Sequence, residues 1–272
     1  MKTDLFQVNA FTNHPCKGNP AGICLASFSS THDIDLSNTI WMQRLAKKMG
    51  LSETAFLQKG KDMYNLRWFT PICEVDLCGH ATLASARVLW ETGRLSPNEQ
   101  AHFNTRSGLL TAKKVQNFIE LDFPAEPETE MDPPSDLIKA LGCSLIYTGK
   151  NRFDYLVEID SEKEICTIHP DLERLRKLPI HSVIVTAQSA TPQYDFVSRF
   201  FAPSAGIDED PVTGSAHCCL GPYWSQKLHK KEMKAYQASS RGGEIVVRIE
   251  NNRTVLKGQA VIVNQKTRTQ HD

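Results

Sequence analysis

The chain has 272 residues, of which 40% are hydrophobic, so it is long enough to bury a large core in two domains or in one large one. Lysine plus arginine equals aspartate plus glutamate at 31 each, so no overall basic field would attract nucleic acid or an anionic membrane. The expected partner is therefore a small molecule or another protein.

The N-terminal residues and the cysteines predict a cytoplasmic chain without a metal site. The first residues, MKTDLFQVNAF, carry an acid at position 4 and lack the apolar core of a secretory signal, and no stretch is apolar for long enough to span a bilayer. The eight cysteines form no CxxC pair and no Cys/His spacing typical of zinc. We expect reduced thiols, most of them buried.

The first half of the chain predicts a helix, two strands and a second helix. Ser37 can cap a helix with Trp41, Leu45 and Met49 on one face, and Gly50 marks its end. The runs ETAFLQK and YNLRWFT follow and are typical of strands. The stretch GHATLASARVLW is apolar nearly all round, which indicates a helix enclosed on every side.

The second half predicts the same series of elements. A linker is expected around residues 124–135, where the chain is rich in proline and acids. Pro170 opens the helical run DLERLRKL, the strand-like runs HSVIVTA and YDFVSRFF follow, and a second enclosed helix starts near Ser215. The final seven residues, KTRTQHD, are expected to fray.

Three short matches indicate that the two halves are copies. The segment that begins at Arg67, RWFTP, reappears as RFFAP from Arg199, an offset of 132 residues. Gly79-His80-Ala81 matches Gly214-Ser215-Ala216, and Arg106-Ser107-Gly108 matches Arg241-Gly242-Gly243, both at an offset of 135. Chance similarity among common residues is the alternative, but the constant order favours duplication. We therefore predict an α+β fold with two pseudo-symmetric lobes, residues 1–117 and 118–272, each with strands around one central helix.

Glycines at the two helix starts suggest an anion site. Free N–H groups and the positive end of the helix dipole attract a negative ligand, and glycine lets that ligand approach the backbone. We expect Gly79, Gly214 and Ser215 to bind a substrate carboxylate where the two lobes meet. The alternative is that both glycines only relieve crowding at a helix start.

Titratable residues cluster at the same two places, and they are Asp76, Cys78, His80, Asp208, Glu209, Asp210 and His217. They are acid/base candidates because burial and helix termini shift pKa values. The alternative for the acids is helix capping. His217, which is placed among cysteine and alanine, is expected to be a core histidine.

Glu53 is the most distinctive acid. It enters the apolar run TAFL directly after a predicted helix, where a carboxylate is costly to bury. The residue 132 positions later is Val185, so a charged residue in one copy corresponds to an apolar residue in the other. A functional carboxylate is one interpretation, and a glutamate at a strand edge facing water is the other.

Taken together, the motifs resemble the PhzF-like family of isomerases and epimerases, and in detail its animal members, called phenazine biosynthesis-like domain-containing proteins. The resemblance rests on VNAFTNHPCKGNPAGICL, LSETAFL, LRWFTPICEVDLCGHATLASA, DFVSRFFAP, EDPVTGSAHC and RGGEI, in the family's order over nearly the whole chain. It implies the diaminopimelate-epimerase-like fold, an active site between the lobes and a homodimer.

The same resemblance implies roles for single residues. Glu53 would be the general base, with His80 and Asp210 as further polar participants. Gly79, Gly214 and Ser215 would hold the carboxylate of a small substrate, and Asn19 and Cys78 would line the site. The implied reaction moves a proton beside a carboxylate, as an isomerisation or an epimerisation, and needs no cofactor.

Two alternatives to this function stay open. A thiol-based amino-acid racemase would use Cys78, but the second helix start has no matching thiol, since Cys218 and Cys219 lie a turn further in. A catalytically silent protein that acts through protein partners would have lost Glu53, His80 or Asp210, and all three are present.

Overall fold

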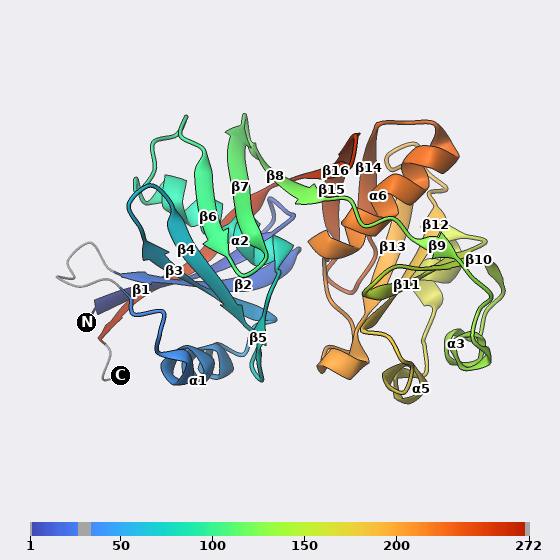
Figure 1. Ribbon diagram of the computed structural model, residues 1–272. Helices are drawn as coiled ribbons and strands as arrows, with labels where there is room; N and C mark the ends of the chain where they lie inside the picture. The colour runs from blue at the N-terminus through green and yellow to red at the C-terminus, as the bar shows by residue number, and fades with distance from the viewer. Residues whose placement is uncertain (1, 27–33, 270–272) are drawn as a thin grey trace. The chain divides into compact units, whose positions relative to one another are not determined.

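The computed structural model describes residues 2–26 and 34–269 of the chain (Figure 1). Contacts divide the chain into two compact units. Unit 1 comprises Met1–Asp122 and Lys257–Asp272, and unit 2 comprises Phe123–Leu256. This division differs from the predicted one, which ended the first lobe at residue 117 and gave the whole C-terminal segment to the second lobe.

Unit 1 is a mixed sheet that wraps around one helix. Its strands are β1 (Lys2–Ala10), β2 (Asn19–Ala26), β3 (Glu53–Lys59), β4 (Tyr64–Phe69), β5 (Glu74–Val75), β6 (Ala101–Thr105), β7 (Gly108–Val115), β8 (Phe118–Pro124), which crosses the boundary, and β17 (Ala260–Thr269). They pair in the order β17-β1-β2-β3-β4-β6-β7-β8. The helix α2 (Gly79–Glu91) contacts β17, β1, β2 and β3 at one side of this order and β7 near the other, so the sheet is curved about it (Figure 1).

The two helices of unit 1 agree with their sequence patterns. Helix α1 (Thr39–Met49) is capped by the side chain of Asn38, one residue after the predicted cap, and ends at Gly50 with φ +62°. Eleven of the thirteen residues of α2 are buried, as its apolar composition predicts. No helix in the described part of the chain is both long and apolar enough to cross a membrane.

Unit 2 is built in the same way. Its strands are β9 (Thr129–Glu130), β10 (Leu145–Lys150), β11 (Asp154–Ile159), β12 (Ser182–Gln188), β13 (Phe196–Phe201), β14 (Glu232–Gln237), β15 (Gly243–Glu250) and β16 (Arg253–Gly258), and its helices are α3 (Ser135–Leu141), α4 (Glu162–Thr167), α5 (Leu172–Arg176) and α6 (Gly214–Leu228). Strands β9 to β15 pair in sequence order, and α6 contacts β11, β14 and β15. The predicted linker contains β9, which pairs with β10, and the start of α3.

The strand pairings repeat from one unit to the other. The series β1-β2-β3-β4-β6-β7 is antiparallel, parallel, antiparallel, parallel, antiparallel, and so is β10-β11-β12-β13-β14-β15. Arg67 pairs with Phe56 where Arg199 pairs with Val185, so the predicted offset of 132 holds in β4 and β13. The two pseudo-symmetric lobes predicted from the sequence are confirmed.

The predicted counterpart of Glu53 is wrong. Glu53 makes the first pair of the parallel β2–β3 ladder, opposite Ala21, and the first pair of the β11–β12 ladder joins Asp154 to Ser182. Ser182, not Val185, therefore occupies the place of Glu53, and Val185 corresponds to Phe56. The offset changes because the loop after β12, residues 189–195, is three residues longer than the loop after β3, residues 60–63.

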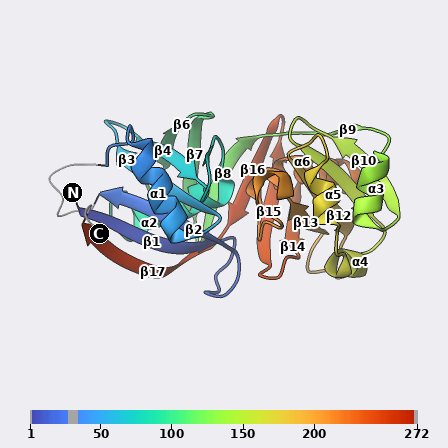
Figure 2. The same cartoon turned by 90° about the horizontal axis from the view of Figure 1, so that it is seen from below.

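The C-terminal strand explains why the end of the chain belongs to unit 1. Strand β17 pairs antiparallel with β1 along its length, so the first and the last strand of the chain lie side by side in Figure 2. In unit 2 the corresponding neighbour of β10 is β9, which follows unit 1 in the sequence. The predicted frayed tail is wrong for Lys266, which pairs with Leu5; residues 270–272 lie outside the described residues.

Candidate active site

Glu53 is held at the start of β3 inside unit 1. It is 8% exposed, so the interpretation of a water-facing glutamate at a strand edge is wrong. The following residues, Thr54 and Ala55, are fully buried. A carboxylate in such surroundings is costly unless polar groups face it, which directs attention to its neighbours.

Asn19 is the first residue of β2 and is fully buried. Gly18, just before it, has φ +71°, and a Cβ there would collide with the carbonyl oxygen of Ala10. Only glycine fits this close approach, and the turn that it permits brings the Asn19 side chain to the interior. The amide of Asn19 reaches His80, with Nδ2 3.2 Å from Nδ1 of the ring.

Cys78, Gly79 and His80 form the start of α2. Cys78 is the N-cap residue, and its side chain makes no capping hydrogen bond to this first turn. All three residues are buried. The Sγ atom of Cys78 lies 3.5 Å from Nδ1 of His80, and Oε2 of Glu53 lies 3.2 Å from Nε2 on the other side of the ring. The predicted residues of the first lobe therefore converge on His80.

Hydrogen bonds orient the His80 ring. Ser52 donates from Oγ to Oδ1 of Asn19 at 3.2 Å, so the Asn19 amide presents its Nδ2 donor to Nδ1 of His80. Nδ1 is then the acceptor, and Nε2 carries the proton and faces Glu53. The approach of Nε2 to Glu53 is not aligned as a hydrogen bond, which is common in catalytic sites without substrate.

Burial decides the charge of His80. The side chain is 4% exposed, and desolvation lowers its pKa from 6.5 to about 3. The ring is therefore neutral at physiological pH, and its Nε2 lies beside the Glu53 carboxylate. Ser52, which the sequence analysis did not select although it lies within LSETAF, completes this set of side chains.

Three of the predicted acids lie elsewhere and make ion pairs. Asp76 has a side chain that is 72% exposed and lies 3.6 Å from Arg106, and Asp208 is 66% exposed and lies 3.5 Å from Arg176. Glu209 accepts two hydrogen bonds from the Arg199 guanidinium, at 2.7 and 2.9 Å. Each of these acids therefore faces an arginine, and only Glu209 does so in a largely buried position.

Arg199 and Glu209 repeat a pair of unit 1. Arg67 binds Glu74 in the same bidentate way, with both bonds at 2.6 Å. Arg67 lies in β4 and Glu74 in the short strand β5 before α2, whereas Arg199 lies in β13 and Glu209 in the segment before α6. The two arginines mark the repeat in the sequence, but their glutamate partners carry no such mark.

Asp210 lies before α6 in unit 2 and is 5% exposed. Its carboxylate accepts a hydrogen bond from the hydroxyl of Thr213. Gln237, which the sequence analysis missed, accepts from the Thr213 N–H and donates to the Asp210 carbonyl, each at 2.7 Å. Gly214 is buried and Ser215 exposed at the start of α6, whose first turn also lacks a side-chain cap.

The interior of α6 holds residues that face the core. His217 is fully buried, its Nδ1 is 2.8 Å from the Thr213 carbonyl oxygen, and burial lowers its pKa to about 4, so it is the core histidine that the sequence predicts. Cys218 and Cys219 are also buried, and desolvation raises the pKa of both thiols. They are therefore poor sources of a catalytic thiolate.

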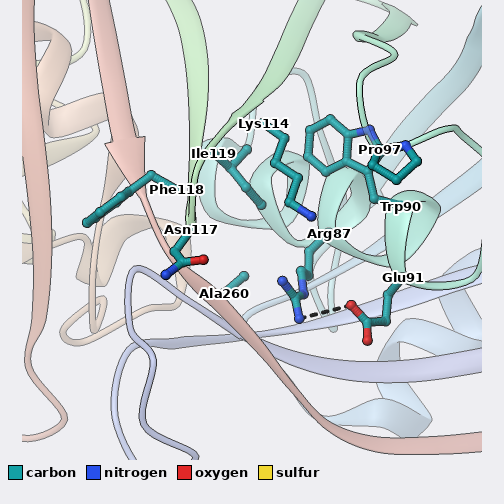
Figure 3. Close-up of a pocket in the computed structure, with 9 residues that line it drawn as sticks. All are labelled: Arg87, Trp90, Glu91, Pro97, Lys114, Asn117, Phe118, Ile119 and Ala260. Carbon is teal, nitrogen blue, oxygen red and sulfur yellow. Dashed lines mark ion pairs between the residues drawn. The ribbon is translucent and has the colours of Figure 1, made fainter.

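A pocket elsewhere in unit 1 contains none of the predicted site residues (Figure 3). It is lined by Trp90 and Phe118 together with Lys114, and Arg87 binds Glu91 at 2.9 Å along its wall. These residues belong to the C-terminal half of α2 and to the strands near it, whereas His80 lies at the helix start.

Comparison with known proteins identifies the family. The family profile described as phenazine biosynthesis-like protein matches residues 8–266. An uncharacterized isomerase of Halalkalibacterium halodurans is 52% identical over 97% of each chain, and phenazine biosynthesis-like domain-containing protein 1 of Mus musculus is 40% identical over 99% of this chain and 100% of its own length. The chain is thus similar to animal members of the family, as predicted, but it has a higher sequence identity to the bacterial isomerase.

Solved structures agree. The PhzF-family phenazine biosynthesis protein of Enterococcus faecalis has a TM-score of 0.91 at 36% identity, covering 99% of this chain and 100% of its own. A probable proline racemase of Agrobacterium radiobacter, at 11% identity, has a TM-score of 0.65 over 97% of this chain and 92% of its own and shows the fold alone. The α+β, diaminopimelate-epimerase-like fold is confirmed. The chain belongs to the phenazine biosynthesis-like (PhzC-PhzF) family and, with it, to isomerase-type enzymes.

Proposed function

We propose that this chain moves a proton on a small carboxylate-bearing substrate, with Glu53 as general base and without a cofactor. One observation carries the proposal: Glu53 is a buried carboxylate, and its Oε2 lies 3.2 Å from a neutral histidine that Asn19 and Ser52 orient. A positioned carboxylate beside a neutral imidazole is suited to taking up and returning a proton.

In the proposed step, the proton that is removed from the substrate is returned to the substrate. Glu53 takes the proton from a carbon that is activated by an adjacent carboxylate or conjugated system, and the C–H electron pair moves into an enolate-like species. The resulting carboxylic acid of Glu53 then returns the proton to another carbon or to the other face. His80, which is neutral, lies beside this carboxylate.

The free N–H groups at both helix starts suit the proposed carboxylate binding. Gly79 stands at the uncapped start of α2, and Gly214 and Ser215 stand at the uncapped start of α6. We propose these residues as anion ligands, with Asn19 and Cys78 beside the first. Asp210, held by Thr213, is the proposed second polar participant.

The thiol-based alternative finds less support. Cys78 lies beside His80, but the thiols of unit 2 lie inside α6, where burial raises their pKa. A racemase with two cysteines needs a thiolate at each helix start. The carboxylate mechanism has as its base Glu53, whose carboxylate already lies beside His80.

Hydrogen–deuterium exchange tests the proposal. Small unsaturated and amino carboxylic acids are incubated with the enzyme in D₂O, and incorporation at carbon is followed by NMR. We expect exchange with the wild type, a loss of at least about 100-fold in Glu53→Gln, which matches the usual contribution of a general base, and no loss in Glu120→Gln. Glu120 is a matched control because it is also buried in unit 1, at 6% exposure.

Two outcomes would contradict the proposal. Exchange that persists in Glu53→Gln would remove the general base. Exchange that is lost in Cys78→Ser but kept in Glu53→Gln would favour thiol chemistry instead.

A further inference from the structure

Gln237 is a fully buried amide whose side-chain partners lie in the segment before α6. It is the last residue of β14, and it is paired with Ser198 on one side and with Gly243 on the other. Its Oε1 accepts a hydrogen bond from the N–H of Thr213 at 2.7 Å. Its Nε2 donates to the carbonyl oxygen of Asp210 at 2.7 Å and to Oγ1 of Thr213 at 3.1 Å. A side chain on the sheet of unit 2 therefore holds the segment that carries Asp210.

The same amide fixes the direction of the Thr213 hydroxyl. Because Oγ1 of Thr213 accepts from Gln237, its single hydrogen is left for the carboxylate of Asp210, to which it donates. The main-chain N–H of Asp210 donates to the carbonyl oxygen of Phe200 at 3.0 Å. Asp210 is thus held at its N–H, at its carbonyl and at its carboxylate, and two of these three contacts depend on Gln237.

The three residues of this network differ together from their counterparts in unit 1. At an offset of 135 residues, the counterparts are Val75 for Asp210, Cys78 for Thr213 and Thr105 for Gln237. Strand pairing supports the last correspondence, because each residue lies opposite the glycine that begins the next strand. The hydroxyl of Thr105 donates to the carbonyl of Gly108 at 2.7 Å, within its own turn. Unit 1 therefore reaches the shared fold without this network.

We propose that Gln237 is a positioning residue for the proton transfer, and that it acts by holding Asp210 and the Thr213 hydroxyl in place. The proposal rests on the proposed function, because it deepens the role of Asp210 as second polar participant. A group that takes part in proton transfer must be held within about 0.5 Å of its place, and a buried amide on a paired strand supplies such a support.

Steady-state deuterium exchange tests this role, with the carboxylic acid of the panel that the wild type exchanges fastest. Gln237→Met keeps the length of the side chain and removes its three hydrogen bonds. We expect it to lower kcat at least about 10-fold and to change KM less than about 3-fold, because a misplaced polar group costs rate more than binding. Ser239→Ala is the matched control, since Ser239 donates to the carbonyl of Pro211 in the same segment at 2.7 Å. It should change kcat less than about 2-fold.

The pH dependence of Gln237→Glu separates positioning from loss of stability. A protonated glutamate can donate one hydrogen bond and accept another, whereas an ionised one can only accept. The ratio of kcat in Gln237→Glu to kcat in the wild type should therefore rise as the pH falls from 8 to 5, whereas the ratio for Gln237→Met should stay constant. Loss of stability would give the opposite trend, because the neutral, buried His217 makes the fold less stable at lower pH.

Crystal structures of the wild type and of Gln237→Met read the position of Asp210 without a substrate. We expect the carboxylate of the variant to be displaced by at least about 1 Å relative to the strands of unit 2. A carboxylate within about 0.5 Å of its wild-type place would overturn the proposal. If Gln237→Met does not fold, Gln237→Glu at pH 8 takes its place in this comparison.

The failure of this role and that of the proposed function can be told apart. A wild type that exchanges no proton on any acid of the panel rejects the proposed function and, with it, this role. A wild type that exchanges, together with a Gln237→Met variant whose kcat equals that of Ser239→Ala, rejects the role of Gln237 alone. A Gln237→Glu ratio that does not change with pH also counts against Gln237 and leaves Glu53 untouched.

Discussion

Single residues in the two buried helices show how burial sets charge. His80 and His217 are both neutral because desolvation lowers their pKa values, to about 3 and about 4. Their surroundings nevertheless differ. His80 is contacted by Asn19, Cys78 and Glu53, whereas Nδ1 of His217 contacts a carbonyl oxygen of its own helix. The first therefore meets side chains from three separate segments of unit 1, and the second meets the backbone at the start of its own helix.

His217 predicts a pH dependence of stability. Its pKa falls from 6.5 in the unfolded chain to about 4 in the folded one, so the unfolded state binds more protons between these values, and stability is lost as the pH falls through that window. Between pH 7 and pH 5 we expect His217 to account for a loss of about 2 kcal/mol in the free energy of unfolding. Urea titrations of wild type and His217→Gln at both pH values measure it.

The test compares how far the free energy of unfolding falls between pH 7 and pH 5 in the two proteins. A destabilisation by the glutamine that is equal at both pH values does not affect this comparison. His80 stays in both proteins and contributes equally to each. If the free energy of unfolding of His217→Gln falls as steeply between pH 7 and pH 5 as that of the wild type, His217 is charged in the folded protein and this assignment fails.

At the scale of elements, an arginine side chain binds the segment of chain that precedes each buried helix. Arg199 in β13 binds Glu209 and also donates to the carbonyl oxygens of Ile165 and Ile168, at 3.2 and 2.7 Å. Its side chain is only 11% exposed. Arg67 and Glu74 do the same in unit 1, so the loops that carry Asp210 and Cys78 are fastened alike.

We therefore expect Arg199→Met to destabilise the protein strongly. The change leaves Glu209 and two carbonyl oxygens without their donor, which costs about 3 kcal/mol in the free energy of unfolding. Arg174→Met is the matched control, because Arg174 pairs with Asp171 at the surface with both side chains about half exposed, and its loss should cost less than about 1 kcal/mol. Equal losses in denaturant titrations would contradict this role for Arg199.

At the scale of the molecule, the first long strand of each unit pairs with a strand that comes after the other unit in the sequence. β17 follows unit 2 in the sequence and pairs with β1 of unit 1, whereas β9 follows unit 1 and pairs with β10 of unit 2. Unit 2 is therefore continuous in the sequence and unit 1 is not.

This connectivity predicts different behaviour for fragments. A fragment of residues 123–256 should unfold cooperatively on heating, because it keeps all the strands from β9 to β15. Residues 1–122 alone should lack a cooperative transition, because β1 loses its partner β17 and exposes a buried edge. Joining 257–272 to 1–122 through a flexible linker should restore the transition, as followed by circular dichroism; cooperative unfolding of 1–122 alone would refute this account.

The sequence by itself determined the repeated architecture, the two enclosed helices and the candidates Asn19, Glu53, Cys78 and His80, because apolar periodicity, glycine positions and motif order are local or repeated signals. It could not give the counterpart of Glu53, since a loop longer by three residues shifts the register and only strand pairing reveals it. Nor could it give the contact of Ser52 with Asn19 or the return of β17, because these contacts join residues far apart in the chain. The glutamate partners of the two arginines are near in the sequence, but no periodic pattern marks them. Only the tertiary structure separates the buried Glu53 from the exposed Asp76 and Asp208, because burial and neighbours, not residue type, distinguish these acids.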